Sequence, residues 1–215
     1  LGVVYQAAYY QATQDAELEP QLSTTASYTD ENGQIQLDKI FQDVDESLNL
    51  YQNVLRYTGL EFLCGDIATY TGASAVDMVV TLHACDTATD YALYKAVRWG
   101  ASVILSVPCC QHEWNREMES EALASVLQYG IVRERMAALF TDAFRANLLE
   151  ACGYKTQLLE FIDMEHTPKN ILIRGMKKET PSEEAKARRI EEIGKEIKEN
   201  FGLTPTLYRL LTETE

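Results

Sequence analysis

Two continuously apolar segments on either side of a helical pattern constrain the fold of this 215-residue chain more than any other feature. The segments VDMVVTLHA (76–84) and ASVILSVPCC (101–110) lack a polar alternation, which is typical of strands buried in a parallel sheet. The first is apolar enough to predict a central strand. Between them, TATDYALYKAVRWG (87–100) predicts a helix that closes at Gly100. Strand, helix and strand in this order predict an α/β fold.

Neighbouring segments extend this pattern. LEFLCGDI (60–67) predicts a further strand that ends in Gly-Asp. Two later strands are joined by EHTPKN (165–170), a connection short enough to favour an antiparallel hairpin at the edge of the sheet. Residues 35–55 have apolar side chains at helical spacing, although KIFQDVD within them is also compatible with a short strand that ends in acids. The predicted helices are 3–18, 35–55, 114–129 and 133–152, the last ending at Gly153.

The C-terminal part of the chain predicts an amphipathic helix. Thr180, Pro181 and Glu183 have the arrangement of a capping box with proline at the first helical position, and Gly202 ends the pattern. Two interpretations stay open: the helix packs on its own domain, or residues 181–201 bind a protein partner. Its apolar face consists of Ile190, Ile193, Ile197 and Phe201.

Composition limits the class of protein. No apolar run approaches the roughly 18 residues that span a bilayer, so we expect no membrane association. Five cysteines without a disulfide spacing favour a reducing, cytoplasmic location. The formal charge of −14 disfavours tight binding of nucleic acid by this chain alone. However, nine of the 19 lysines and arginines lie between Lys169 and Lys198, which leaves a local basic surface open.

Polar residues follow three of the predicted strands, at Gly65-Asp66, at 83–86 and at 108–113. The carboxyl ends of parallel strands share one edge of an open sheet, and ligands bind in the crevice outside it. Asp66 suits a hydrogen bond from an adenine amine, or it is a helix N-cap. In the same way Asp86, Thr87 and Thr89 are candidates to cap the helix that begins near Ala88.

The stretch VPCCQHE (107–113) allows three kinds of chemistry. A cysteine nucleophile activated by His112 is one alternative. A loop that positions substrate beside a cofactor is another, and we prefer it. A zinc site is the third, but the usual CxxC spacing is absent, so we expect no metal. Its ligands would come from His83, Cys85, Cys109, Cys110 and His112.

Together LHACDTATD, VPCCQHE and EHTPKN resemble a known family over roughly residues 58–177. They are similar to class I S-adenosylmethionine-dependent methyltransferases of the methyltransferase-domain group found in many Firmicutes, with relatives among eukaryotic methyltransferase-like proteins. A more distant similarity links two groups of residues to the eukaryotic tRNA ribose methyltransferases that act in the acceptor stem. The first group is His83, Cys85, Ala88, Thr89 and Asp90, and the second is Cys109, Cys110 and His112. The resemblance implies a Rossmann-like, seven-stranded sheet, mostly parallel with an antiparallel C-terminal hairpin and with helices on both faces. It divides the chain into 1–57, a methyltransferase core at 58–178 and a C-terminal helix and tail at 179–215.

The resemblance also implies a cofactor, S-adenosyl-L-methionine, and roles for matching positions. As a working hypothesis, we expect His112, with Glu113 or Asp86 nearby, to orient or deprotonate the hydroxyl or amine of the methyl acceptor. The cofactor would be bound by Asp66, Ile67, Leu82, His83, Ala84 and Cys85, with Asp45 as a candidate for the ribose hydroxyls. The acceptor would be bound by Cys109, Cys110, Gln111, His166, Lys169 and Asn170.

One departure from the family concerns the glycine-rich turn that lets the backbone approach the methionine part of the cofactor. Residues 1–57 contain only Gly2 and Gly33, in no GxG context, and Leu1 is not an initiator. We favour the absence of this turn from the chain, while its replacement by another segment and a fold that binds no cofactor stay open. The resemblance favours RNA, either tRNA or rRNA, as the substrate. A small molecule or protein acceptor and a non-catalytic interaction module stay open as alternatives. RNA phosphates would be bound by Lys169, Arg174, Lys177 and Lys178.

Overall fold

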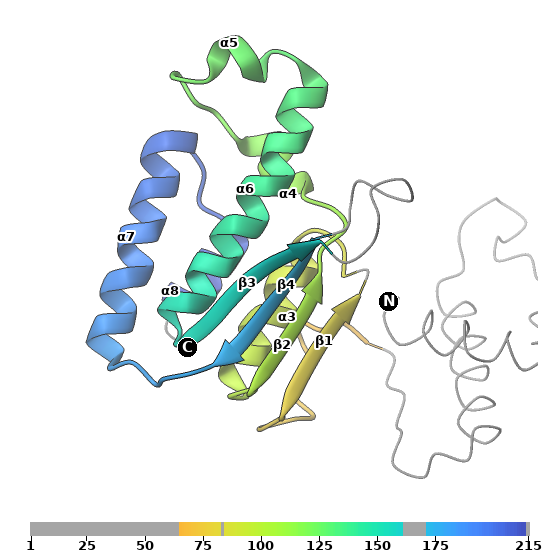
Figure 1. Cartoon of the computed structure of the whole chain (residues 1–215), viewed down its shortest axis with the longest axis vertical. Helices are drawn as coiled ribbons and strands as arrows, with labels where there is room; N and C mark the ends of the chain where they lie inside the picture. Colours follow the sequence, from red (N-terminus) through yellow and green to blue (C-terminus); the bar gives the residue numbers. More distant parts are fainter. Residues whose placement is uncertain (1–64, 83, 161–170, 214–215) are drawn as a thin grey trace, which may run out of the picture. The chain divides into compact units, whose positions relative to one another are not determined.

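The computed structural model describes residues 65–82, 84–160 and 171–213 (Figure 1). The chain divides into two compact units, Leu1–Asp66 and Ile67–Glu215, and all the elements below belong to the second. Several predicted segments lie outside the described residues: the helices at 3–18 and 35–55, most of the strand at 60–67, and the EHTPKN turn.

The described sheet has four strands in the order β1-β2-β4-β3. β1 pairs in parallel with β2, whereas β4 is antiparallel to both β2 and β3. The α/β class is confirmed, and so is the antiparallel pairing of the last two strands. The hairpin also lies at one end of the described sheet, as expected, with β4 next to β2 and β3 as the outermost strand. This mixed order departs from a purely parallel Rossmann sheet. The strands are β1 (Met78–Leu82), β2 (Val103–Val107), β3 (Tyr154–Glu160) and β4 (Ile171–Lys177).

Helices follow the strands in the expected places, with one exception. The helix after β1 ends before Gly100, which has a φ of 71°, and the long helix before β3 ends before Gly153, with a φ of 93°. None of the described helices is both long and apolar enough to cross a bilayer. The helices are α3 (Thr87–Arg98), α4 (His112–Glu117), α5 (Ala124–Leu127), α6 (Gly130–Ala151), α7 (Glu183–Phe201) and α8 (Thr206–Thr212).

The predicted helix at 114–129 is the exception, because it is interrupted after Glu117. Arg133 donates hydrogen bonds from its guanidinium to the carbonyls of Asn115 (2.7 Å) and Met118 (2.7 Å). These carbonyls are among the groups that a continuing helix would use internally, so Arg133 stabilises the end of α4. The chain then turns, and the backbone N–H of Glu119 donates to the carbonyl of Phe201 at 2.8 Å.

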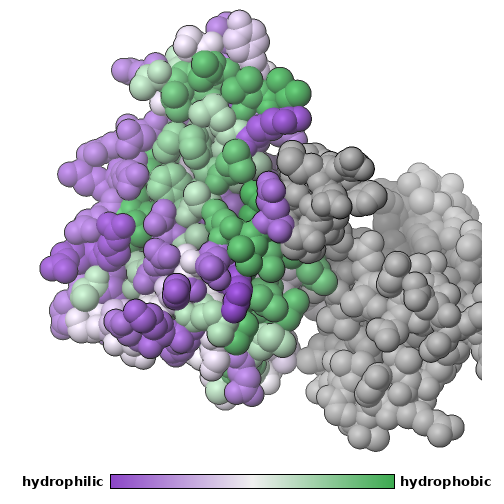
Figure 2. Space-filling model, viewed as in Figure 1, coloured by the Kyte–Doolittle hydropathy of each residue, from purple (hydrophilic) through white to green (hydrophobic). Residues whose placement is uncertain are grey.

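The described helices that contact the sheet pack on one of its faces. Thr81, Ser106 and Ile173 are cross-strand neighbours and are all buried on that face, under α3 and α6. Figure 2 views the opposite face, where hydrophobic residues gather over the strands. There Met78 is 55% exposed and Val80 is 43% exposed. Because residues 1–64 lie outside the described residues, the expectations of a central β1 and of helices on both faces stay predictions.

The C-terminal helix α7 begins two residues later than the capping-box pattern predicts. Ser182 is the N-cap, and its hydroxyl accepts a hydrogen bond from the backbone N–H of Ala185 at 3.2 Å. Gly202 ends the helix with a φ of 72°, as expected. The helix packs its apolar face on its own unit, and its role in binding a partner stays a prediction. Its buried residues are Ile190, Ile193, Gly194 and Ile197.

Candidate functional site

Two of the three predicted polar strand ends meet in the structure. β1 and β2 are parallel neighbours in register, with Leu82 opposite Val107. Their carboxyl ends therefore lie side by side, and the described residues of the loops that follow, 84–86 and 108–111, form one rim. The third strand end belongs to the other unit, where Asp66 is exposed. Its proposed contact with adenine stays a prediction.

Asp86 connects the two loops. Its side-chain Oδ1 accepts a hydrogen bond from the backbone N–H of Glu113 at 3.0 Å, so it caps α4 and not its own helix. Asp86 has a φ of 52° and is the one non-glycine residue with a positive φ in the described parts of the chain. Such a conformation persists only where surrounding contacts hold it, and it is frequent at functional sites. The hydroxyl of Thr89, a second expected cap, donates to the carbonyl of Ala84.

Arg145, a buried residue of α6, stabilises the positive-φ conformation of Asp86 through a hydrogen bond to its backbone. Arg145 of α6 donates to the backbone carbonyl of Asp86 at 2.9 Å. It also forms a bidentate pair with Asp90 of α3, at 2.9 and 2.7 Å. A third contact, at 3.2 Å, reaches Asp142 on its own helix. The guanidinium thereby joins the β1–α3 loop, α3 and α6. Sequence reasoning missed it, although an Asp and an Arg three residues apart in a largely apolar helix were a signal.

Gln111 belongs to the same buried network. Its amide donates to the second carboxylate oxygen of Asp142 at 3.2 Å, and the residue is buried. We had expected Gln111 to bind the acceptor. The amide of Gln111 forms a buried hydrogen bond with Asp142, so its described contact is structural. This hydrogen bond fixes the β2–α4 loop to α6.

Burial sets the ionisation of this network. It raises the pKa of Asp142 to about 6, against the opposing effects of Arg145 and Gln111. Burial also acts to lower the pKa of the Arg145 guanidinium, but the carboxylates of Asp90 and Asp142 outweigh it and hold that pKa above its usual range. Arg145 therefore stays charged, and Asp142 is the group that titrates near neutral pH.

Asp142→Asn is expected to change how stability depends on pH. The folded pKa of Asp142, about 6, lies above the unfolded value, so its protonation stabilises the fold below pH 4. That contribution is lost as the pH rises from about 4 to about 6 and amounts to about 3 kcal/mol, because each pKa unit corresponds to about 1.4 kcal/mol. Asparagine removes the titration. Urea unfolding of both proteins at pH 4, 5, 6 and 7 checks this: the wild type should lose stability relative to the variant across the range, and parallel profiles would contradict it.

Three cysteine thiols meet at the rim. The Sγ of Cys109 lies 3.2 Å from that of Cys85 and 3.7 Å from that of Cys110. Burial, followed by the neighbouring thiols, raises the pKa of Cys109 to about 12. The thiol is therefore neutral at physiological pH without a further partner, which argues against the cysteine-nucleophile alternative. Of the five residues considered as zinc ligands, these three come together, His112 is not in their group, and His83 lies outside the described residues.

The two residues that begin α4 have different surroundings. His112 is its first residue and is exposed. Glu113 is buried, and its carboxylate accepts hydrogen bonds from the hydroxyl of Thr206 (2.6 Å), the backbone N–H of Thr206 (3.1 Å) and Arg209 (3.3 Å). It therefore anchors the start of α8. This corrects the expectation that Glu113 acts on the methyl acceptor, because its carboxylate is occupied on the inner side of α4.

The remaining predicted site residues are only partly described. Leu82, Ala84 and Ile67 are half-buried, and Cys85 is exposed. Asp45, His83, His166, Lys169 and Asn170 lie outside the described residues.

The predicted phosphate contacts do not lie at the rim. Met176 pairs with Val103 at the first residue of β2, and the backbone N–H of Lys177 donates to the carbonyl of Ser102 at 2.9 Å. Because β4 is antiparallel, Lys177 and Lys178 are at the amino end of β2, more than about 13 Å from its carboxyl end at 3.3 Å per residue. Arg174 pairs with Leu105, halfway along the sheet. Lys169 lies outside the described residues, and the contact of these cations with RNA phosphates stays a prediction.

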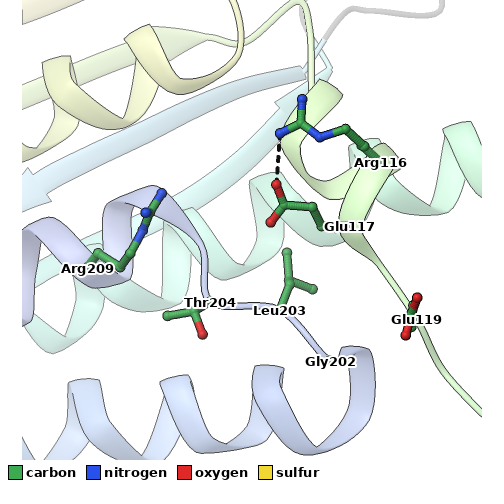
Figure 3. Close-up of a pocket in the computed structure, with 7 residues that line it drawn as sticks. All are labelled: Arg116, Glu117, Glu119, Gly202, Leu203, Thr204 and Arg209. Carbon is green, nitrogen blue, oxygen red and sulfur yellow. Dashed lines mark hydrogen bonds and ion pairs between the residues drawn. The ribbon is translucent and has the colours of Figure 1, made fainter.

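An open pocket of about 590 Å³ lies on another part of the surface, between the end of α4 and the α7–α8 turn. Figure 3 shows Arg116 and Glu117 joined by an ion pair of 2.8 Å, with Arg209 of α8 also on its wall. None of the predicted site residues lines it, and its charged groups are exposed, so we do not assign it to the site. Its lining residues are Arg116, Glu117, Glu119, Gly202, Leu203, Thr204 and Arg209.

Comparison with known proteins supports a methyltransferase. A family model described as a methyltransferase domain matches residues 20–117, which is less than half of the chain. The match ends at the last residue of α4 and so includes both loops of the rim. Searches of the curated proteins and of the solved structures gave no significant match. The four-stranded mixed sheet with its helices is compatible with a methyltransferase fold, and the matched domain suggests an enzyme.

Proposed function

We propose that this chain is an S-adenosylmethionine-dependent methyltransferase that acts on RNA, either tRNA or rRNA. The observation that carries the proposal is the link between the two loops of the rim: Asp86 binds the backbone N–H of Glu113 at 3.0 Å inside the segment that matches a methyltransferase domain. Such a rim, at the carboxyl ends of parallel strands, is where α/β folds bind nucleoside-containing ligands.

The described residues fit one wall of a cofactor site. Leu82 and Ala84 present half-buried apolar side chains at the end of β1, and Cys85 is exposed beside them. An apolar wall with few polar groups suits the purine of such a cofactor. When bound, S-adenosylmethionine supplies the reactive methyl group. The protein's part is to hold the acceptor in line and to exclude water, a contribution that reaches several kcal/mol.

His112 is the residue we propose to act on the acceptor. Its imidazole is exposed at the first position of α4, one residue before the N–H that Asp86 binds. An exposed imidazole can accept the proton of a hydroxyl or amine as methyl transfer proceeds. Asp86 then has a positioning part, because it fixes the N-terminal turn of α4.

The proposal that RNA is the substrate rests on the resemblance to tRNA ribose methyltransferases. Two observations favour a second candidate substrate. The chain carries a formal charge of −14, and Lys177 and Lys178 lie away from the rim. Both features weaken attraction to a phosphate backbone at the site. A small-molecule acceptor is therefore the alternative.

An assay of methyl transfer tests the proposal directly. Purified chain is incubated with labelled S-adenosylmethionine and with tRNA, rRNA or a small-metabolite extract, and label is measured in each fraction. His112→Ala is expected to lower turnover by at least about 100-fold, within the range of general base catalysis, with little change in cofactor affinity. Arg116→Ala is the matched control, since Arg116 is exposed on the same helix, and its rate should stay within about twofold.

The acceptor fraction and its salt dependence decide between the candidates. Labelled RNA, with binding that weakens steeply as salt is added, supports the RNA proposal. Labelled small molecules with a flat salt dependence support the alternative acceptor and reject RNA. No label in any fraction, together with no binding of S-adenosylhomocysteine, rejects both and supports a non-catalytic interaction module.

A further inference from the structure

The three thiols at the rim come from two loops that are far apart in the sequence. Cys85 follows β1, and Cys109 and Cys110 follow β2. Their Sγ atoms all lie within 4.8 Å of one another, with separations of 3.2 Å from Cys85 to Cys109 and 3.7 Å from Cys109 to Cys110. These are non-bonded distances, so the cysteines are reduced.

The spacing suits a thiophilic metal ion. In a tetrahedral zinc site each Zn–S bond is about 2.3 Å, which places two sulfur atoms about 3.8 Å apart. The observed separations are close to that value, so modest movements would bring three sulfurs around one ion. A hydrogen bond between two thiols would also produce one short distance, but it would not require a third thiol in the same place.

Contacts that do not involve the cysteines hold the two loops in place. Asp86, next to Cys85, binds the N–H of Glu113, and Arg145 binds the carbonyl of Asp86 at 2.9 Å. Gln111, next to Cys110, is fixed to Asp142. Metal sites depend on such supporting contacts to orient their ligands. Cys85 is exposed and the other two are half-buried, which gives an ion a route from solvent.

We propose that Cys85, Cys109 and Cys110 form a three-thiolate site for a divalent ion of the Zn²⁺ type. Binding transfers the three thiol protons to solvent, and the positive ion stabilises the thiolates against their mutual repulsion. Three protein ligands leave a fourth position for water or another small ligand. The ion joins the two loops of the rim. This goes beyond the proposed methyl transfer and reverses the expectation of no metal that the missing CxxC spacing suggested.

The test is a Co²⁺ titration of the reduced, chelator-treated full chain, followed by displacement with Zn²⁺. We expect one equivalent of Co²⁺, with the near-ultraviolet charge-transfer band of thiolate coordination and the visible bands of a tetrahedral site. Cys85→Ser and Cys109→Ser should each weaken binding by more than about 100-fold, since even the loss of a supporting contact costs 10- to 100-fold. Cys152→Ser is the matched control, because Cys152 is a buried cysteine at the end of α6 and should leave binding unchanged.

Two results would overturn the proposal. One is the absence of a charge-transfer band in the reduced wild type, including the case where peptide mapping finds a Cys85–Cys109 disulfide before reduction. The other is an equal loss of Co²⁺ binding in Cys152→Ser. The titration contains neither cofactor nor acceptor, so a failure of methyl transfer and a failure of metal binding are seen separately.

Discussion

Arg145→Met is expected to lower the free energy of unfolding by about 3–5 kcal/mol, the usual result of removing one partner from a buried ion pair. The variant keeps the volume of the side chain but leaves Asp90 and Asp142 buried without their cation. It also removes the donor to the carbonyl of Asp86, which holds a φ of 52°. Urea unfolding at neutral pH measures the loss, and a shift in melting temperature serves if the variant is too unstable for a full curve.

Arg116→Met is the control for this experiment. Arg116 also forms an ion pair, with Glu117 at 2.8 Å, but the two side chains are 71% and 44% exposed. Exposed pairs contribute little to stability because solvent screens them, so the control should be close to the wild type. A triple variant that combines Asp90→Asn, Asp142→Asn and Arg145→Met removes all three charges. It should recover part of the unfolding free energy that Arg145→Met alone loses. A loss below about 1 kcal/mol in Arg145→Met alone would show that the network does not stabilise the fold.

Gly153→Ala is expected to destabilise the protein by about 3 kcal/mol or more. Gly153 has a φ of 93°, and an L side chain in a positive-φ conformation costs about 1–2 kcal/mol. A Cβ there would also lie 2.1 Å from the carbonyl oxygen of Glu179 and 2.8 Å from Pro181. Neither group can rotate away, because the Gly153 carbonyl accepts the backbone N–H groups of Lys178 and Glu179. Thermal unfolding with calorimetry measures the effect.

Two other glycines separate the conformational part of this loss from the steric part. Gly100 has a φ of 71°, and an added Cβ would contact only the flexible end of Lys177, at 3.4 Å. Gly100→Ala should therefore lower the free energy of unfolding by about 1–2 kcal/mol. Gly130 is the first residue of α6, and an added Cβ would have no atom within 4 Å. Gly130→Ala should therefore be neutral or slightly stabilising. Equal losses in all three variants would mean that neither φ nor the contact with Glu179 decides the outcome.

The sequence predicted the elements that depend on local patterns. β1, α3 and β2 are found where two apolar runs flank a helical spacing, and Gly100, Gly153 and Gly202 end helices as expected. The errors depend on distant contacts. The helix expected at 114–129 stops because Arg133 binds its carbonyls, a contact between residues 15 to 18 apart. The hairpin lies at the end of the sheet as predicted, but no periodicity shows that β4, and not β3, is the strand that pairs with β2.

The same reason limited the prediction of the site. That the loops after β1 and β2 meet follows from parallel pairing alone, and this was predicted. The structural role of Glu113 depends on its hydrogen bond with Thr206, which is 93 residues away in the sequence. Arg145 binds Asp90, which is 55 residues away. The sequence spacing of the three cysteines lacks a zinc motif, so it does not predict that their thiols lie together. Spacing rules describe ligands within one loop, whereas these ligands come from two.

Hydrogen exchange with S-adenosylhomocysteine tests the central claim most directly, because it shows both whether the chain binds the cofactor product and where. The amides of the full chain are compared with and without saturating S-adenosylhomocysteine. The account predicts slower exchange in peptides that contain residues 82–90 and 107–113, with the hairpin strands β3 and β4 unchanged. Binding without protection of either loop, or no binding at all, would contradict a cofactor site at the carboxyl ends of β1 and β2.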